Sequence, residues 1–70
     1  MNKVYIITGK YNVEAFEYEE YENIDIDFVH KFEFNTTDEK GAFCKGVQLT
    51  ARYEDYTFID EDEYEMLVNL

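Results

Sequence analysis

Residues 24–39 read IDIDFVHKFEFNTTDE and contain the two clearest structural signals in the chain. Up to Phe34, most apolar side chains occupy even positions and most charged side chains odd positions, as in a half-buried strand. Beyond it, Thr36 is followed three residues later by Glu39, which is the signature of a capping box at a helix start. The sequence therefore predicts a strand over roughly residues 27–35 and a helix that begins at Thr36.

The sequence allows two different end points for the predicted helix. An apolar face running from Ala42 through Val47 to Ala51 favours a long helix. Alternatively, the helix ends at Gly46 and the alternating residues 47–53 form a strand. The second alternative would make the sheet four-stranded.

Two other short stretches are typical of strands. Val4–Thr8 is β-branched and aromatic and is followed by the turn-forming Gly9, and Tyr56–Ile59 has a similar composition. The acidic run Asp60–Glu63 can then cap a last helix. That helix would present Tyr64, Leu67 and Val68 on one face.

The periodicity of residues 13–27 is ambiguous. Val13, Phe16 and Tyr21 fit one face of a helix, whereas Phe16 and Tyr18 alternate as in a strand and lead into the alternation from Ile24. This continuity favours extended structure over the segment.

Together these elements predict an α+β fold. It consists of a small, mainly antiparallel sheet of three or four strands, one main helix packed on a face and a short C-terminal helix. The chain has 70 residues, no proline and no internal repeat, so we expect a single domain over residues 1–70.

Composition excludes several classes of function. Seventeen acidic against six basic residues give a net charge of −11, which argues against direct binding of nucleic acid or of anionic membranes. The hydrophobic fraction of 46% is too high for a disordered chain. A macromolecular partner should therefore be a basic protein.

The excess acid lies in two blocks. Residues 13–27 and residues 54–70 each carry seven carboxylates and no basic residue. If the blocks meet in space, they form one acidic face that also carries aromatic rings, a combination suited to a basic protein groove. If they lie on opposite surfaces, the charge serves only solubility. The aromatic residues of this face would be Phe16, Tyr18, Tyr21, Tyr56 and Tyr64.

No catalytic or metal-binding pattern is present. Cys44 is the only cysteine and His30 the only histidine. Cys44 is expected on a helix and His30 on a strand, so packing roles for the two side chains are favoured over a catalytic pair. The acidic run that begins at Asp60 lacks the glycine of a calcium-binding loop. We expect no enzyme, no cofactor and no metal site. The N-terminal residues lack the pattern of a signal peptide, which favours the cytoplasm.

One stretch carries a resemblance to known proteins. Residues 34–47, FNTTDEKGAFCKGV, followed by YEDY at residues 53–56, resemble short uncharacterised proteins of phages and mobile elements. In size and charge the chain is also similar to phage anti-defence proteins, including anti-CRISPR inhibitors, some of which imitate DNA. The resemblance implies a location in the cytoplasm of a bacterial host cell.

The resulting hypothesis is a small acidic inhibitor or regulator that binds a basic, nucleic-acid-handling host protein and imitates nucleic acid. The expected partner-binding residues are Glu17, Tyr18, Glu19, Glu20, Tyr21, Glu22, Asp60, Glu61, Asp62 and Glu63. The alternative is a structural or oligomerising module with a tyrosine-rich surface that forms a homodimer. A third hypothesis is a small-ligand sponge with a pocket between subunits.

Overall fold

The computed structural model describes residues 2–50 and 55–70. Within them lie three strands, three α-helices and two short 3-10 turns. Their order along the chain is β1 (Lys3–Thr8), α1 (Lys10–Glu17), η1 (Tyr21–Asn23), η2 (Ile26–Phe28), β2 (Val29–Glu33), α2 (Thr37–Thr50), β3 (Tyr56–Ile59) and α3 (Glu61–Val68). The predicted α+β class is confirmed.

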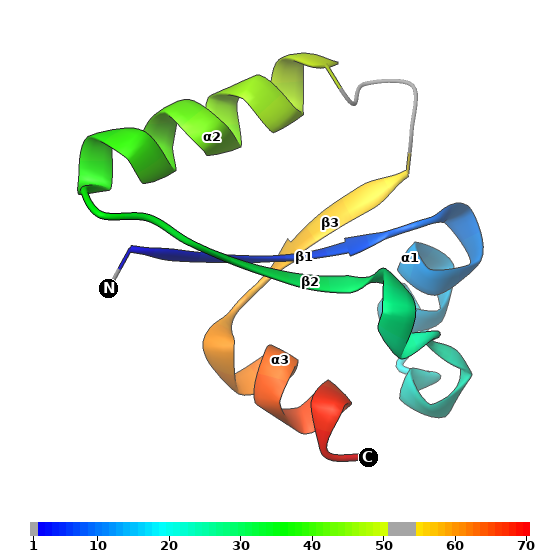
Figure 1. Ribbon diagram of the computed structural model, residues 1–70. Coiled ribbons are helices and arrows are strands. Elements are labelled where there is room, and N and C mark those ends of the chain that lie inside the picture. Colours follow the sequence, from blue (N-terminus) through cyan, green and yellow to red (C-terminus); the bar gives the residue numbers. More distant parts are fainter. Residues whose placement is uncertain (1, 51–54) are drawn as a thin grey trace.

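The sheet has the strand order β2-β1-β3, and both pairings are antiparallel (Figure 1). Tyr5 lies opposite Lys31 on one side and Ile59 on the other. The central strand is the most apolar one, and each residue from Val4 to Ile7 is at most 6% exposed. A run that is apolar on both faces requires cover on both faces of the sheet.

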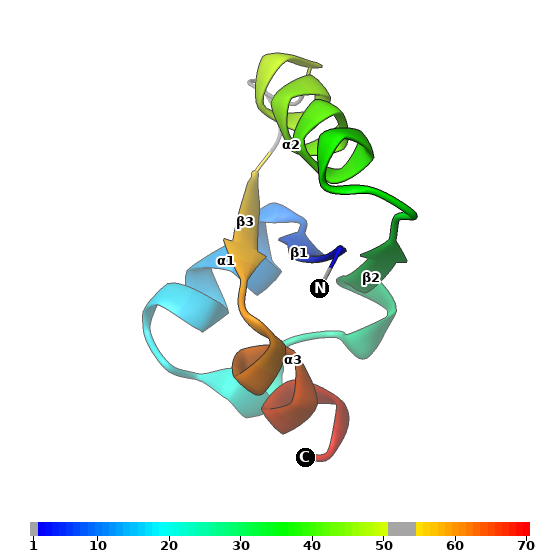
Figure 2. The same ribbon diagram turned by 90° about the vertical axis from the view of Figure 1, so that its left-hand side faces the viewer.

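One face of the sheet carries the main core. Tyr5, Ile7 and Ile59 pack there with Val13 of α1 and Leu67 of α3. Because α1 and α3 both supply core residues, they cover the same face, and Figures 1 and 2 show them on one side of the sheet. Partly buried side chains complete the packing: Phe16, Tyr21, Ile24, Val29 and Tyr64.

Helix α2 covers the opposite face (Figure 2). The ring of Phe43 lies between those of Phe32 and Phe34, with centroid separations of 4.9 and 5.0 Å. The molecule therefore has three layers: α1 with α3, the sheet, and α2. The predicted main helix on one face and short C-terminal helix are present, and α1 is an additional helix.

The extended structure expected for residues 13–27 is wrong. Residues 10–17 form α1, and the chain then turns through η1 and η2 into β2. Val13 and Ala15 are buried and Phe16 is half-buried, so the segment covers the sheet with the apolar face of a helix. Tertiary packing thus decides a periodicity that was locally ambiguous.

Asn12 fixes the position of this segment. Its side chain is only 8% exposed; its amide nitrogen donates to the Thr8 carbonyl (3.1 Å), and its amide oxygen accepts from the Asp25 backbone N–H (2.9 Å). Gly9, with a φ of +92°, turns the chain from β1 into α1. A buried amide with both ends satisfied joins the start of α1 to the turn before η2.

The alternative ending for the main helix is also wrong over residues 47–50. Helix α2 continues through Gly46 to Thr50, and the structure has three strands within the described residues. The remainder of that alternative strand, residues 51–53, lies outside the described residues.

The capping box at Thr36 is confirmed. The Glu39 N–H donates to Thr36 Oγ1, and the Thr36 N–H donates to Glu39 Oε1, both at 3.1 Å. We expect Thr36→Ala to lower the free energy of unfolding by about 1 kcal/mol, because it removes a partner for a helix N–H. Urea unfolding measures the change, and Thr36→Ser, which keeps the capping hydroxyl, is the matched control. Equal stability of the two variants would contradict the role of Thr36.

The predicted capping of the last helix by the acidic run is confirmed, and it takes the form of a second capping box at the start of α3. Asp60 accepts from the Glu63 N–H at 2.8 Å, and the Asp60 N–H donates to Glu63 at 2.9 Å. Tyr64 packs on Tyr5 with a centroid separation of 4.7 Å, and Leu67 is buried. Val68, the last residue of α3, is 39% exposed.

Candidate protein-binding face

The first acidic block and residues 60–70 of the second lie on the same side of the sheet. We call residues 10–28 together with 60–70 the acidic layer; they comprise α1, η1, η2 and α3. They contain twelve carboxylates and one basic residue, Lys10, so they account for the whole net charge of −11. The other residues of the sequence carry five acidic and five basic side chains. The charge is thus segregated to one layer of the fold.

The main core joins the two blocks. Phe16 and Tyr21 from the first block and Tyr64 and Leu67 from the second pack against the same cluster around Tyr5. The loop between α1 and β2 lies beside α3 in both views (Figures 1 and 2). This shared packing gives the two blocks a fixed relative position.

Four of the expected partner-binding carboxylates are exposed and uncommitted, by which we mean that they have no partner among the described residues. The side chains of Glu17, Glu19, Glu22 and Asp62 form no hydrogen bond or ion pair within the described part of the chain. Between described residues, ion pairs occur only at Glu33, which lies outside the acidic layer. These four carboxylates are available to an incoming cation.

The other expected residues have structural roles. Asp60 and Glu63 cap α3, and Glu20 accepts a hydrogen bond from Asn23 Nδ2 at 3.1 Å. Glu61 accepts one from the Tyr5 hydroxyl at 3.4 Å. Burial, followed by the charge of Glu61, raises the pKa of Tyr5 above its ordinary value. Substitution of these carboxylates would therefore change folding.

Only one of the aromatic residues expected on the acidic face is strongly exposed there. Tyr18 is 73% exposed, but Phe16, Tyr21 and Tyr64 are half-buried against the core. Tyr56 lies opposite Thr8, in the cavity under α2, so its predicted place on the acidic face is wrong. Alternate residues of β3 point to opposite sides of the sheet, so Tyr56 faces α2 while Ile59, three residues later, faces the main core.

Sequence reasoning missed Tyr11. It is 83% exposed at the start of α1, seven residues before Tyr18, and both rings border a hollow of 380 Å³. Glu14 and Glu20 line the same hollow. The i, i+3, i+7 spacing of Tyr11, Glu14 and Tyr18 could have indicated this exposed helix face. Exposed rings beside carboxylates are suited to the side chain of an arginine or lysine.

Glu19 has an unusual backbone conformation. Its φ is +59°, in the left-handed region that favours glycine. The Glu20 N–H donates to the Ala15 carbonyl (2.8 Å) and the Glu19 N–H to the Phe16 carbonyl (3.2 Å). This is a Schellman motif that ends α1 with glutamate where glycine is usual. Backbone strain at a residue that is not glycine is often found at binding sites, so the Glu19 carboxylate is a candidate for contact with a partner.

We expect Glu19→Gly to raise the free energy of unfolding by about 0.5–1 kcal/mol, because glycine adopts a positive φ without steric cost. Glu17→Gly, two residues earlier within the helix, should lower it by up to about 1 kcal/mol. Both variants lose one carboxylate, so charge does not distinguish them. Chemical denaturation of the two proteins tests the difference in sign. A destabilised Glu19→Gly variant would contradict the left-handed cap.

A mainly apolar cavity lies between α2 and the sheet. It has a volume of 230 Å³, and Ile6, Phe43 and Val47 form part of its wall. His30 Nε2 and Thr8 Oγ1, 3.1 Å apart, supply a hydrogen-bonded pair in the same wall. Cys44 lines a different cavity, so the structure does not bring the only thiol and the only imidazole into one site.

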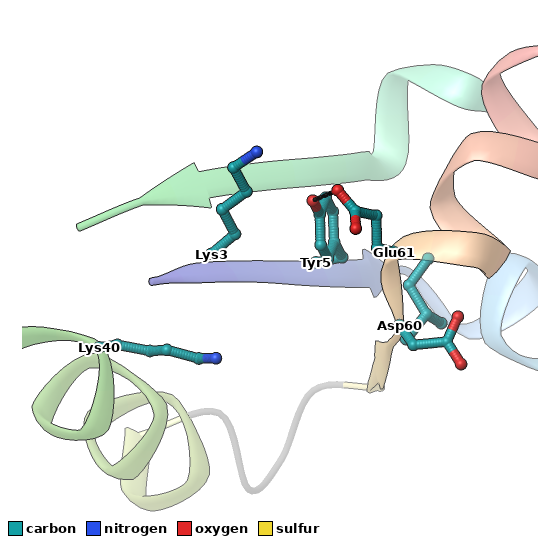
Figure 3. A pocket seen from close by; sticks show the side chains of 6 residues that line it. Lys3, Tyr5, Lys40, Asp60 and Glu61 are labelled. Carbon is teal, nitrogen blue, oxygen red and sulfur yellow. Dashed lines mark hydrogen bonds between the residues drawn. The ribbon is translucent and has the colours of Figure 1, made fainter. Parts of the chain in front are cut away.

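A third cavity, of 280 Å³, lies where β1 extends beyond β3 (Figure 3). Lys3 and Lys40 reach it from β1 and α2, and Asp60 and Glu61 line it from the start of α3. Its charges are balanced, and both carboxylates already accept hydrogen bonds from the protein. The cavity therefore carries no net charge that would select an ionic ligand.

Within residues 2–50 and 55–70, no group of three or more potential ligand side chains is arranged to hold a metal ion. The same part of the chain contains no helix with the length and apolar character needed to cross a membrane. Comparisons with protein-family models, curated proteins and solved structures gave no match.

Proposed function

We propose that this chain is a protein-binding inhibitor or regulator whose acidic layer occupies the nucleic-acid-binding surface of a basic host protein. The observation that carries the proposal is the segregation of the whole net charge into one layer. A charge that served only solubility would have no reason to be confined to one side of a small fold.

The chemistry of the surface fits this role. Exposed carboxylates at Glu17, Glu22 and Asp62 can accept hydrogen bonds from the same lysine and arginine side chains that bind phosphates. Tyr11 and Tyr18 add exposed rings, on which guanidinium groups stack. Nucleic acid presents the same combination of negative charge and flat aromatic surface.

The mechanism is competition. The inhibitor and the nucleic acid would neutralise the same basic residues, so each would exclude the other from the partner. Because a field of one sign steers a partner of the opposite sign, association should be fast at low salt and slow at high salt. Glu19 and Glu22, on the turn after α1, extend the charged surface beyond the helix.

The test begins with capture of basic proteins from a bacterial lysate on the immobilised chain, followed by purification of each captured protein. The decisive measurement is binding of the purified partner in the presence of increasing double-stranded DNA and, separately, increasing salt. We expect DNA to displace the chain, and affinity to fall as salt rises. A purified partner that binds DNA and this chain simultaneously would refute the proposal, as would the lack of any saturable basic partner.

The matched variant replaces three carboxylates with amides, Glu17→Gln, Glu22→Gln and Asp62→Asn, which changes the net charge from −11 to −8. These substitutions keep side-chain volume and touch none of the capping residues. We expect this variant to fold normally, to bind the partner more weakly and to show a shallower salt dependence of binding. Unchanged binding would assign the contact to another surface.

A further inference from the structure

The outer edge of β2 is a row of unused backbone hydrogen-bonding groups. The strand order leaves β2 at one margin of the sheet, where Figure 2 shows no element beside it. The Phe34 N–H donates to the Asn2 carbonyl at 2.7 Å, which makes residues 30, 32 and 34 the ones that bond to β1. The backbone groups of Val29, Lys31 and Glu33 therefore point outward.

The Val29 N–H donates to the Ile26 carbonyl at the end of η2. The outward groups of Lys31 and Glu33 form no hydrogen bond within the described part of the chain. The three residues Lys31, Phe32 and Glu33 are all exposed, and Phe32 still exposes 38% of its surface although it packs on Phe43. An exposed strand edge that carries a large apolar side chain is a template for pairing with another strand.

The order of residues in β2 makes this edge complementary to itself. We propose that β2 pairs antiparallel with β2 of a second copy, with Phe32 opposite Phe32 of the partner subunit. This register places Lys31 opposite the partner's Glu33 twice, and both residues have outward backbone groups, as the ladder requires. The result is a homodimer with one continuous six-stranded sheet.

Neighbouring registers are unfavourable. A shift that centres the dimer on Lys31 would place two lysines opposite each other, and like charges directly opposite one another are destabilising. A shift by one residue would place the outward backbone groups of one β2 strand opposite the inward groups of the other. It would also turn the paired side chains to opposite faces of the sheet. The Lys-Phe-Glu order therefore selects one pairing.

Charge also favours this edge for contact between two copies. Each copy carries a net charge of −11, so approach through the acidic layer would be strongly repulsive. At the β2 edge, Lys3 and Lys31 surround Glu33 at 3.8 and 3.4 Å, so charges of both signs are present. The acidic layers remain exposed in such a dimer and can still bind a partner.

The first test is a charge swap followed by light scattering over a range of concentrations. We expect the native chain to shift from 8.4 kDa towards twice that mass as concentration rises. Lys31→Glu and Glu33→Lys should each weaken dimerisation at least tenfold, because each places like charges opposite one another. The double variant should restore the dimer. Circular dichroism shows whether each variant remains folded.

The second test determines the register by oxidation. Paired residues outside the hydrogen-bonded positions have Cα atoms about 4.5 Å apart, within the range that a disulfide spans. In a Cys44→Ser background, Phe32→Cys should form a covalent dimer rapidly, whereas Gln48→Cys on the exposed face of α2 should not.

A native chain that stays monomeric at all concentrations would overturn the proposal. So would a dimer that the double variant does not restore, since that result would place the contact elsewhere, for example at the exposed tyrosines of α1. Pairing of the edge with an extended segment of a different protein, with no self-association, would also refute it. None of these results bears on DNA competition at the acidic layer, so the two proposals can fail separately.

Discussion

Replacing Ile7 with Ala is expected to unfold a substantial fraction of the molecules at room temperature. Ile7 has no exposed surface and lies on the central strand, opposite both Val29 and Thr57. Truncation of a buried Ile to Ala costs about 2–5 kcal/mol, and a domain of this size has a total stability of roughly 3.5–10 kcal/mol. The loss is therefore comparable with the whole stability of the fold.

Ile26→Ala is the matched control, because it removes the same atoms from a side chain that is 48% exposed. Urea denaturation followed by circular dichroism should show a change of less than about 0.5 kcal/mol for this variant. Similar midpoints for the two variants would mean that the core is not centred on Ile7.

Reversal of three uncommitted charges, Glu17→Lys, Glu22→Lys and Asp62→Lys, should separate folding from function. Each reversal adds two charge units, so the net charge changes from −11 to −5. Reduced self-repulsion should raise the melting temperature at low salt. Association with a basic partner should slow by about 10- to 1,000-fold, because electrostatic steering is lost. Stopped-flow kinetics and thermal denaturation on the same samples measure both effects.

Asp38→Lys with Asp55→Lys is the control for the double reversal Glu22→Lys with Asp62→Lys, since both pairs change the net charge from −11 to −7. Asp38 and Asp55 are exposed but lie outside the acidic layer. We expect this variant to keep most of the association rate. If the two variants slowed association equally, net charge rather than the acidic layer would govern recognition.

The elements with local signals were predictable from the sequence. The capping boxes at Thr36 and Asp60 each involve residues three apart, so no distant contact is needed to recognise them. The apolar run Val4–Thr8 similarly indicated a strand, and its position at the centre of the sheet explains the burial of Val4–Ile7.

Helix α1 was not predictable by the same means. Its amphipathic face is short, and the carboxylates that interrupt it fit a helix and a strand equally well. The choice depends on tertiary contacts: Val13 packs in the same core cluster as Ile7, and the Asn12 side chain accepts a hydrogen bond from the Asp25 N–H.

The candidate site was predictable only in part. The two acidic blocks are visible in the sequence, but their common side depends on α1 and α3 covering the same face of the sheet. Tyr56 was assigned to the wrong side, because strand pairing sets which residues of β3 face α2.

The strand order also has a consequence for synthesis. β1 emerges from the ribosome first, but its second neighbour, β3, follows about fifty residues later, and Leu67 of the core comes later still. At 5–20 residues per second, the most apolar strand waits roughly 3–10 s for its final neighbour. The carboxylates of residues 13–27 emerge directly after it. During that interval they flank the unpaired apolar strand with charge, which disfavours its aggregation.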